Sequence, residues 1–199
     1  KIAVLPGDGI GPEIMAQALR VLDYLIYDER LDVDIESGSL GAQAYFEYGD
    51  PFPDYTKAIC DNADAILKGP VGLGHNETQK IPLESRPERG AILPLRKRYD
   101  TYANYRPVRL SSKMKQFSPL KNELLEAGVD FIIVRELVGG LYFGEKSQGV
   151  NADGLRYVSE TLEYDEAQIR RVVVAAFDLA SGRRGLLHNI HKSNVLLSS

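Results

Sequence analysis

The sequence predicts an α/β fold with a mainly parallel sheet, because short apolar runs alternate with amphipathic segments from the first residue onward. The run "KIAVLP" precedes a helical pattern from Pro12 to about Tyr27, and "LDVDIES" precedes the helical stretches "GAQAYFEYG" and "DYTKAICDNA". A third apolar run, "DAILKGP", completes a series typical of βαβ units. Pro12 supports the first helix start, since an N–H at that position would have no helical partner.

The segment "ERGAILPLRKRYD" predicts a further helix. Pro94 within it favours an early or kinked first turn over a regular helix interior. Helical spacing of three and four residues places Ile92, Leu93 and Arg96 on one face, so that an apolar patch lies beside a guanidinium. The following "TYANYRP" predicts a strand, in which Arg106 is extended because it precedes a proline.

The pattern of predicted strands and helices changes after Pro107. "SPLKNELLEAG" predicts a helix, "VDFIIVREL" a buried strand, and the stretch from "GGLYFGEK" to "GLRYVSETLEY" an extended, glycine-punctuated hairpin. "DEAQIRRVVVAAFDLASGR" predicts a helix with at most a partial capping box and a stop at Gly182, and "GLLHNIHKSNVLLSS" a strand running into a helix start. Near residues 101–106 the alternation of strands and helices gives way to a hairpin-rich pattern, which predicts two domains, 1–103 and 104–199.

The composition excludes several classes of protein. A hydrophobic content of 44% in 199 residues is enough for a buried core, and a formal net charge of -4 argues against a nucleic-acid-binding surface. No apolar run of about eighteen residues and no secretory signal pattern occurs, which predicts a cytoplasmic protein without a membrane partner. The single Cys60 excludes a disulfide within the chain and is predicted to be a small buried hydrophobe, not a nucleophile.

The glycine-rich stretch "LPGDGIGPEI" follows a strand and opens a helix, as a dinucleotide-binding turn does. However, Gly7, Gly9 and Gly11 give the spacing GxGxG, which is not the Rossmann fingerprint. We therefore expect a loop near a ligand, but not a Rossmann site.

Three arginines end predicted strands or helices: Arg96, Arg106 and Arg135. Any one of them is equally well explained by a surface salt bridge. Ligand crevices in α/β proteins open at such ends, so the three together favour a site for a substrate with more than one carboxylate.

Two further segments contain side chains suited to proton transfer. Tyr142 in "GGLYFGEK" is either a packing residue or a positioned phenolic proton donor. Lys192 in "HNIHKSNVL" is either exposed or a base whose proton is loosened by nearby cations. His188 and His191, three apart in a predicted strand, point to opposite faces and make a poor metal pair.

Four segments, taken in order, carry a resemblance that covers essentially the whole chain: "KIAVLPGDGIGPEI", "ERGAILPLRKRYDTYANYRP", "VDFIIVRELVGGLYFGEK" and "HKSNVL". Together they resemble the isocitrate/isopropylmalate family of β-decarboxylating dehydrogenases. The resemblance implies a two-domain, non-Rossmann α/β fold, with residues 1–103 in the cofactor-side domain and 104–199 in a substrate and dimerisation domain with a hairpin arm. It also implies that the fold is incomplete here. We expect the metal-binding aspartates and the segment that clasps the adenosine of NAD to lie beyond Ser199, and the 199-residue chain alone to be inactive.

The resemblance also assigns roles to residues. Arg96, Arg106 and Arg135 match the arginines that bind the substrate carboxylates, Tyr142 matches the tyrosine that assists proton transfer, and Lys192 matches the base on the substrate hydroxyl. The positions matched to the cofactor NAD are Ile10, His75, Asn76, Glu88 and Asn194. The resemblance further implies Mg²⁺ or Mn²⁺ and a homodimer, because in the family the lysine is contributed to the neighbouring subunit's site. The residues that would choose between NAD and NADP are not in this sequence.

Substrate choice in the resembled family depends on the helix that carries Arg96. Members that use isocitrate have Ser and Asn six and four residues before that arginine, where this sequence has Gly90 and Ile92. Ile92 and Leu93 form an apolar wall suited to an alkyl group. The expected reaction is therefore the oxidative decarboxylation of 3-isopropylmalate to 2-oxoisocaproate in leucine biosynthesis. "AILPLR" is one residue longer than in some members, which leaves open which apolar residue contacts the alkyl group.

Two alternatives to this reaction remain. The first is a homoisocitrate, D-malate or tartrate dehydrogenase on the same scaffold, since "YDTYANYRPVRL" and His191 are also similar to other branches of the family. The second is a truncated, non-catalytic paralogue that binds a carboxylate ligand or a partner subunit.

Overall fold

The computed structural model describes residues 1–28, 31–126 and 128–198, and the chain separates into two compact units, Lys1–Arg98 and Tyr99–Ser199. We call these the first and the second unit. The sequence placed the boundary between residues 103 and 104, which lies inside a strand that the second unit keeps whole, β4 (Ala103–Leu110).

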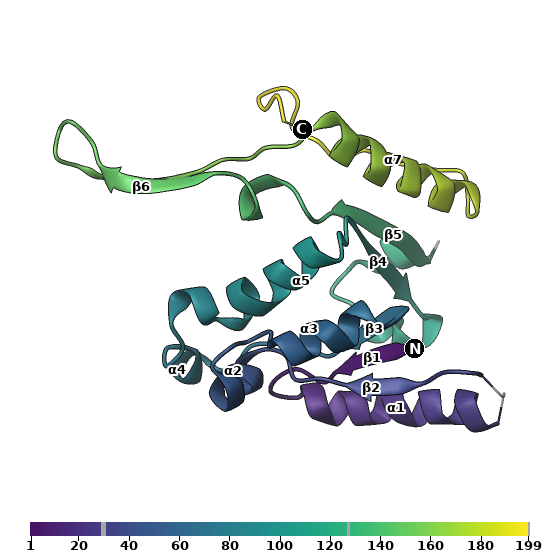
Figure 1. The fold of residues 1–199 in the computed structure, drawn as a ribbon. Helices are drawn as coiled ribbons and strands as arrows, with labels where there is room; N and C mark the ends of the chain where they lie inside the picture. The colour runs from purple at the N-terminus through teal and green to yellow at the C-terminus, as the bar shows by residue number, and fades with distance from the viewer. Residues whose placement is uncertain (29–30, 127, 199) are drawn as a thin grey trace. The chain divides into compact units, whose positions relative to one another are not determined.

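The first unit is built around a parallel sheet, as the apolar runs predicted (Figure 1). Its strands are β1 (Ile2–Leu5), β2 (Ile35–Ser37) and β3 (Ala65–Lys68), in the order β2-β1-β3. The central strand β1 pairs with both neighbours, and its last three residues are fully buried. All three strands end at the same edge, where the connecting turns meet.

The helices of the first unit follow the predicted alternation with the strands. They are α1 (Gly11–Tyr27), α2 (Ala42–Tyr48), α3 (Asp54–Asp61), α4 (His75–Thr78) and α5 (Leu93–Arg98), with a 3-10 turn η1 (Leu83–Ser85) and a π-helical turn η2 (Pro87–Ile92). Figure 1 shows α1 and α3 on opposite sides of the sheet, as right-handed crossovers to its two edges require. Cys60 is 2% exposed on α3, which confirms the prediction of a buried residue.

The predicted helix "ERGAILPLRKRYD" is divided into two kinds of turn. Over η2 the helix is wider than an α-helix, and the backbone N–H of Leu93 donates to the carbonyl oxygen of Glu88, five residues earlier. The α-helix α5 then begins at Leu93, so Pro94 lies in its first turn, where no backbone N–H is needed.

In its described residues, the second unit has two antiparallel strand pairs, one long helix and several short turns (Figure 1). The strands are β4, β5 (Val129–Glu136), β6 (Lys146–Val150) and β7 (Arg156–Glu160); the helices are α6 (Asn122–Leu125) and α7 (Glu166–Ser181), with 3-10 turns η3 (Ser112–Phe117) and η4 (Gly140–Tyr142). The predicted hairpin is present as β6–β7, and every residue of its two strands is exposed. None of the helices in the described part of the chain is long and apolar enough to cross a membrane.

Strand β5 is half-covered, so the prediction that it is buried was wrong. Helix α7 packs on the face of the β4–β5 pair that carries Tyr105, Ile132 and Val134. Phe131 and Ile133 alternate with these residues, point to the other face, and are 45% and 49% exposed. A run that is apolar on both faces fits a strand covered on both sides, and among the described residues only one side is covered.

Helix α7 agrees with its predicted limits, and its start is better built than expected. The side chain of Asp165 accepts from the backbone N–H of Gln168, whose own side chain accepts from the N–H of Asp165. This is a complete capping box, and the helix ends at Gly182 as predicted. The strand expected over "GLLHNIH" is absent, because residues 186–191 form no regular structure.

Candidate functional site

The turn between β1 and α1 packs closely on the segment that follows β3. Gly7 has a φ of 77°, and a Cβ atom there would lie 2.0 Å from the carbonyl oxygen of Pro70. The backbone N–H of Asp8 donates to the same oxygen at 2.8 Å. Only a glycine permits this approach, which explains the first glycine of the "GDGIG" motif.

The side chain of Asp8 connects three segments at this edge of the sheet. It is 3% exposed, and its carboxylate accepts from the backbone N–H groups of Ala42 at 2.8 Å, Gln43 at 2.9 Å and Gly72 at 2.7 Å. The sequence analysis did not identify Asp8, because its partners are backbone groups 34 to 64 residues away and no local pattern marks them.

The residues expected to approach NAD in the first unit lie at the ends of its elements. Ile10 is the N-cap of α1 and 65% exposed, His75 and Asn76 begin α4 and are exposed, and Glu88 is exposed on η2. The loop after β3 passes close to Glu88, since a Cβ on Gly72 would lie 3.2 Å from its Oε1. A dinucleotide needs both a flat apolar contact and hydrogen-bond partners. The exposed Ile10 could provide the first, and the glycine backbone and the polar side chains named above could provide the second.

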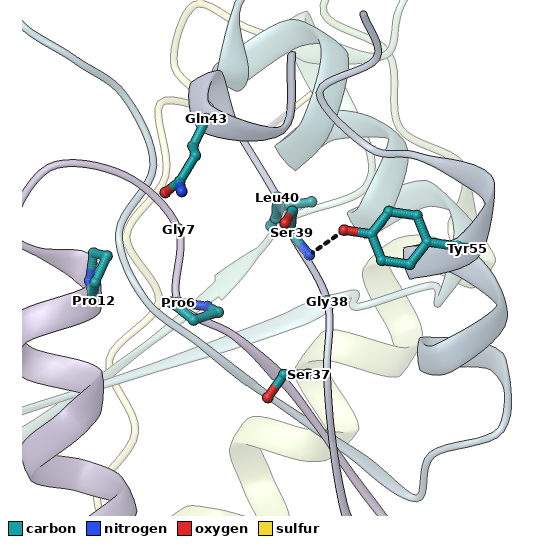
Figure 2. Close-up of a pocket in the computed structure, with 9 residues that line it drawn as sticks. All are labelled: Pro6, Gly7, Pro12, Ser37, Gly38, Ser39, Leu40, Gln43 and Tyr55. Atoms are coloured by element: carbon teal, nitrogen blue, oxygen red, sulfur yellow. Dashed lines mark hydrogen bonds between the residues drawn. The ribbon is translucent and has the colours of Figure 1, made fainter. Parts of the chain in front are cut away.

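A hollow of about 290 Å³ opens next to the glycine-rich turn, and Figure 2 shows the side chains around it. Its walls include Pro6, Pro12 and Leu40, with the polar side chains of Gln43 and Tyr55. The hydroxyl of Tyr55 accepts from the backbone N–H of Ser39 at 3.0 Å, as the dashed line in Figure 2 marks. The residues predicted to bind NAD do not line this hollow.

Arg96 lies half-buried on α5, one turn after Ile92 and Leu93, which are also half-buried. The predicted apolar pair is therefore on the helical turn that directly precedes the turn carrying the guanidinium. Lys68, at the end of β3, belongs to the same surroundings and was not identified from the sequence. Burial of its ammonium group lowers the pKa of Lys68 and the charge of Arg96 lowers it further, while the charge of Asp8 acts in the opposite direction. Its Nζ donates to the carbonyl oxygen of Gly69 at 2.7 Å.

Arg106 and Arg135 lie on one face of the β4–β5 pair. Arg135 is directly opposite Asn104, and Arg106, two residues further along β4, is opposite Ile133. Residues opposite one another in an antiparallel pair share a face, so the two guanidiniums are diagonal neighbours on the face that α7 does not cover. Among the described residues no carboxylate forms an ion pair with either of them. Both arginines are exposed, whereas Arg135 was expected at the end of a buried strand.

Tyr142 ends the turn η4 and is 53% exposed. The guanidinium carbon of Arg135 lies 5.8 Å from the centre of its ring, so the structure brings these two predicted site residues together. Glu136 shapes the intervening turn: its carboxylate accepts from the backbone N–H of Val138 at 3.0 Å and of Gly139 at 2.9 Å. The sequence analysis did not identify Glu136, which again acts through backbone groups.

Lys192 and Asn194 lie in an exposed turn of the second unit. The carbonyl oxygen of Lys192 accepts from the backbone N–H groups of Val195 and Leu196, both at 2.9 Å. Next to it, Nδ1 of His191 is 2.7 Å from Oγ of Ser193 and accepts from the backbone N–H of the same serine at 3.2 Å. The turn replaces the helix start that the sequence predicted.

The described residues bring together no group of three or more His, Cys, Asp or Glu side chains that could hold a metal ion. The donor set of a divalent cation is therefore not found within the described part of this chain.

A parallel α/β unit with a close glycine turn and a second unit with an antiparallel, arginine-bearing strand pair agree with the non-Rossmann α/β fold that the resemblance implied. Comparison with known families agrees: the isocitrate/isopropylmalate dehydrogenase family matches residues 1–199. The chain belongs to this family.

Individual relatives give the same result. The chain is 47% identical over 197 residues to a 3-isopropylmalate dehydrogenase of Symbiobacterium thermophilum, covering 98% of this chain and 52% of that protein. It is 46% identical to one of Carboxydothermus hydrogenoformans, covering 100% and 52%. Among solved structures, an isocitrate dehydrogenase of Methylococcus capsulatus has a TM-score of 0.71 at 25% identity, covering 92% of this chain and 48% of that one. A β-decarboxylating dehydrogenase of Thermococcus kodakarensis has a TM-score of 0.66 at 29% identity, covering 98% and 49%. The chain spans about half the length of the relatives that it matches.

Proposed function

We propose that the complete protein is an NAD-dependent, divalent-metal-assisted dehydrogenase that converts 3-isopropylmalate to 2-oxoisocaproate in leucine biosynthesis, in the cytoplasm. The observation that carries the proposal is that the curated relatives, 40–47% identical over nearly all of this chain, are 3-isopropylmalate dehydrogenases.

The surroundings of Arg96 support an alkyl-bearing substrate. Ile92 and Leu93 precede the arginine, and position 90 is restricted to glycine by its neighbours. A Cβ at Gly90 would lie 2.5 Å from Cγ of Pro51 and 3.0 Å from the carbonyl oxygen of Glu84. A serine could not occupy this position without moving η2, so the hydroxyl that would bind an additional carboxylate is excluded on packing grounds.

The arginines suit the two carboxylates of such a substrate. A guanidinium binds a carboxylate through two parallel N–H donors, and Arg106 and Arg135 present two of these groups on one uncovered face. We propose that Arg106 and Arg135 bind substrate carboxylates, and that Arg96 is also a carboxylate-binding residue, as the family resemblance implies.

The proton transfers are assigned to Lys192 and Tyr142. Nζ of Lys192 would act as the general base that takes the proton of the substrate C2 hydroxyl. NAD, when bound, would accept the hydride from C2. After CO₂ is lost, Oη of Tyr142 would donate the proton that takes its place. The guanidinium carbon of Arg135, 5.8 Å from the ring centre, would help to orient the phenol.

The exposed apolar surface of the second unit supports a homodimer. Val150, Tyr157 and Val158 of the hairpin and Val174 and Phe177 of α7 are between 44% and 75% exposed. Exposed apolar side chains on both the hairpin and α7 are the kind of side chain that a contact with another chain would cover. We propose a second copy of the complete protein as the partner.

Lys68 favours a second candidate, a homoisocitrate-type dehydrogenase. Burial lowers the pKa of Lys68 and the charge of Arg96 lowers it further, so the ammonium group and the guanidinium belong to the same part of the first unit. An additional substrate carboxylate would pair with both cations, whereas an alkyl group would offer Lys68 no charged group.

Steady-state kinetics of the complete protein on a panel of 2-hydroxy diacids test the proposal. We expect the highest kcat/KM for 3-isopropylmalate, with homoisocitrate, D-malate and tartrate at least about tenfold lower. A preference for malate over its isopropyl derivative would rule out the first candidate.

The variant Lys68→Met separates the two candidates further, because it keeps the length of the side chain and removes the charge. If homoisocitrate is the substrate, its kcat/KM falls by about 10- to 100-fold, the value of one hydrogen bond to a charged group. If 3-isopropylmalate is the substrate, its kcat/KM changes by less than about threefold.

A further inference from the structure

Asp8 is a buried carboxylate to which the proposed reaction assigns no part. Only 3% of the residue is exposed, and the partners of its side chain are three backbone N–H groups. Burying an ionised carboxylate is costly unless hydrogen bonds replace the lost water. Three donors at 2.7 to 2.9 Å do so, which makes these contacts strong and directional.

The contacts of Asp8 hold the loop after β3 from two sides. Its backbone N–H donates to the carbonyl oxygen of Pro70 at 2.8 Å, and its Oδ2 accepts from the N–H of Gly72 at 2.7 Å. The same Oδ2 accepts from Ala42, and Oδ1 accepts from Gln43, at the start of α2. The loop after β3, the β1–α1 turn and α2 are thus joined through one side chain.

The loop held in this way reaches the residues assigned to NAD. A Cβ on Gly72 would lie 3.2 Å from Oε1 of Glu88, so the backbone at Gly72 is next to that carboxylate. Three residues further along, His75 and Asn76 begin α4. A shift of Gly72 therefore moves the chain that leads to His75 and changes the space beside Glu88.

We propose that Asp8 is a positioning residue of the dinucleotide site, holding residues 70–72 where Glu88, His75 and Asn76 can meet the cofactor. The inference rests on the proposed function, since it assumes that NAD binds beside Glu88. Asp8 touches no reacting atom. The negative charge matters as well as the shape, because an asparagine in its place would turn an NH₂ group toward one of the three backbone donors.

The variant Asp8→Asn in the complete protein tests the proposal, with Asp23→Asn on the exposed surface of α1 as the matched control. We expect KM for NAD to rise about 10- to 100-fold, corresponding to the loss of one hydrogen bond to a charged acceptor. KM for the hydroxy diacid and kcat at saturating NAD should change by less than about threefold. Hydrogen exchange at the amide of Gly72 should become about tenfold faster or more, while the control leaves all four quantities unchanged.

Gly72→Ala supplies an independent variant if Asp8→Asn does not fold. Alanine rarely adopts the φ of 110° found at Gly72, and its methyl group would press on Glu88 from 3.2 Å, so the same rise in KM for NAD is expected.

The outcomes are distinguishable. Faster exchange at Gly72 with an unchanged KM for NAD overturns the positioning role, and unchanged exchange overturns the attachment of the loop. If the wild type and Asp23→Asn both fail to use NAD, the proposed function is refuted, and the role of Asp8 in a dinucleotide site is refuted with it.

Discussion

Replacing Glu136 by glutamine should loosen the turn that presents Tyr142. The carboxylate accepts two backbone N–H bonds, from Val138 at 3.0 Å and from Gly139 at 2.9 Å, one on each oxygen. Glutamine keeps one oxygen and turns an NH₂ group toward the second donor, so one of the two bonds is lost and the other becomes a bond to a neutral acceptor.

The magnitude follows from these contacts. A hydrogen bond to a charged group contributes about 1.5–3 kcal/mol, and the half-buried position of Glu136 favours the lower end, so we expect Glu136→Gln to reduce the free energy of unfolding by about 1.5 kcal/mol. Urea denaturation followed by circular dichroism measures this value. In the complete protein, a mobile Tyr142 should lower kcat by about tenfold with little change in KM.

Tyr164 provides a second readout of the same substitution. Burial raises the pKa of Tyr164 and the charge of Glu136 raises it further, while Arg135 acts against both. Because the folded pKa is raised, the favourable contribution of the neutral phenol is present below the ordinary value of about 10 and is lost as the pH rises through the folded pKa. Glu136→Gln should move the pKa of Tyr164 back toward its ordinary value, as measured by absorbance of the ionised phenol.

The control for both readouts is Glu163→Gln, which removes the same charge from an exposed residue next to Tyr164 and leaves the bonds of Val138 and Gly139 intact. If Glu136→Gln unfolds at the same urea concentration as this control, the carboxylate does not hold the turn and the reasoning is refuted.

Three further predictions concern the second unit. Lys192→Ala in the complete protein should reduce kcat by about a hundredfold or more with a small change in substrate KM, and an unaffected kcat would show that another group is the base. Asp165→Ala should lower the free energy of unfolding by about 1 kcal/mol, because the backbone N–H of Gln168 loses its capping partner. Thermal denaturation measures this loss, and an unchanged stability would mean that the cap contributes nothing. Arg183 lowers the pKa of the Asp130 carboxyl, so their ion pair stabilises the fold above the ordinary pKa of that carboxyl and is lost as the pH falls through the lowered value. In the variant Arg183→Gln, NMR should show the Asp130 carboxyl titrating at a higher pH than in the wild type. An identical titration would show that Arg183 does not lower the pKa of Asp130.

Regular elements were predictable where local signals agree. Helix α7 has an acidic start, an apolar stripe and Gly182 at its end, and its limits were correct. The parallel sheet of the first unit followed from its apolar runs, because each run is flanked by a turn and a helical pattern.

The errors have physical causes as well. "GLLHNIH" is apolar enough for a strand, but a strand requires a partner, and among the described residues no strand pairs with it. β5 has an apolar sequence on both faces, and its sequence alone does not reveal that only one face is covered within this chain.

The sequence analysis proposed site residues that carry a charge or lie in a recognisable motif, and it did not point to side chains that act through the backbone. The pairing of Arg106 with Arg135 on one face could be derived only once the register of β4 against β5 was known. Asp8 and Glu136 bind backbone N–H groups, and every residue except proline carries such a group, so no sequence pattern points to the partner.

The π-helical turn η2 has a consequence for how specificity can change in this family. It contains Glu88 and precedes Arg96, and a π turn takes up one more residue than an α turn in the same length of helix. Deleting one residue there would restore α-helical spacing and leave the side chains before and after the turn in nearly the same orientation, because the wide turn already accommodates the extra residue. A residue can therefore be gained or lost in the apolar wall without turning Arg96 away, so a change in length alone alters which side chains form the wall, without any substitution in α5.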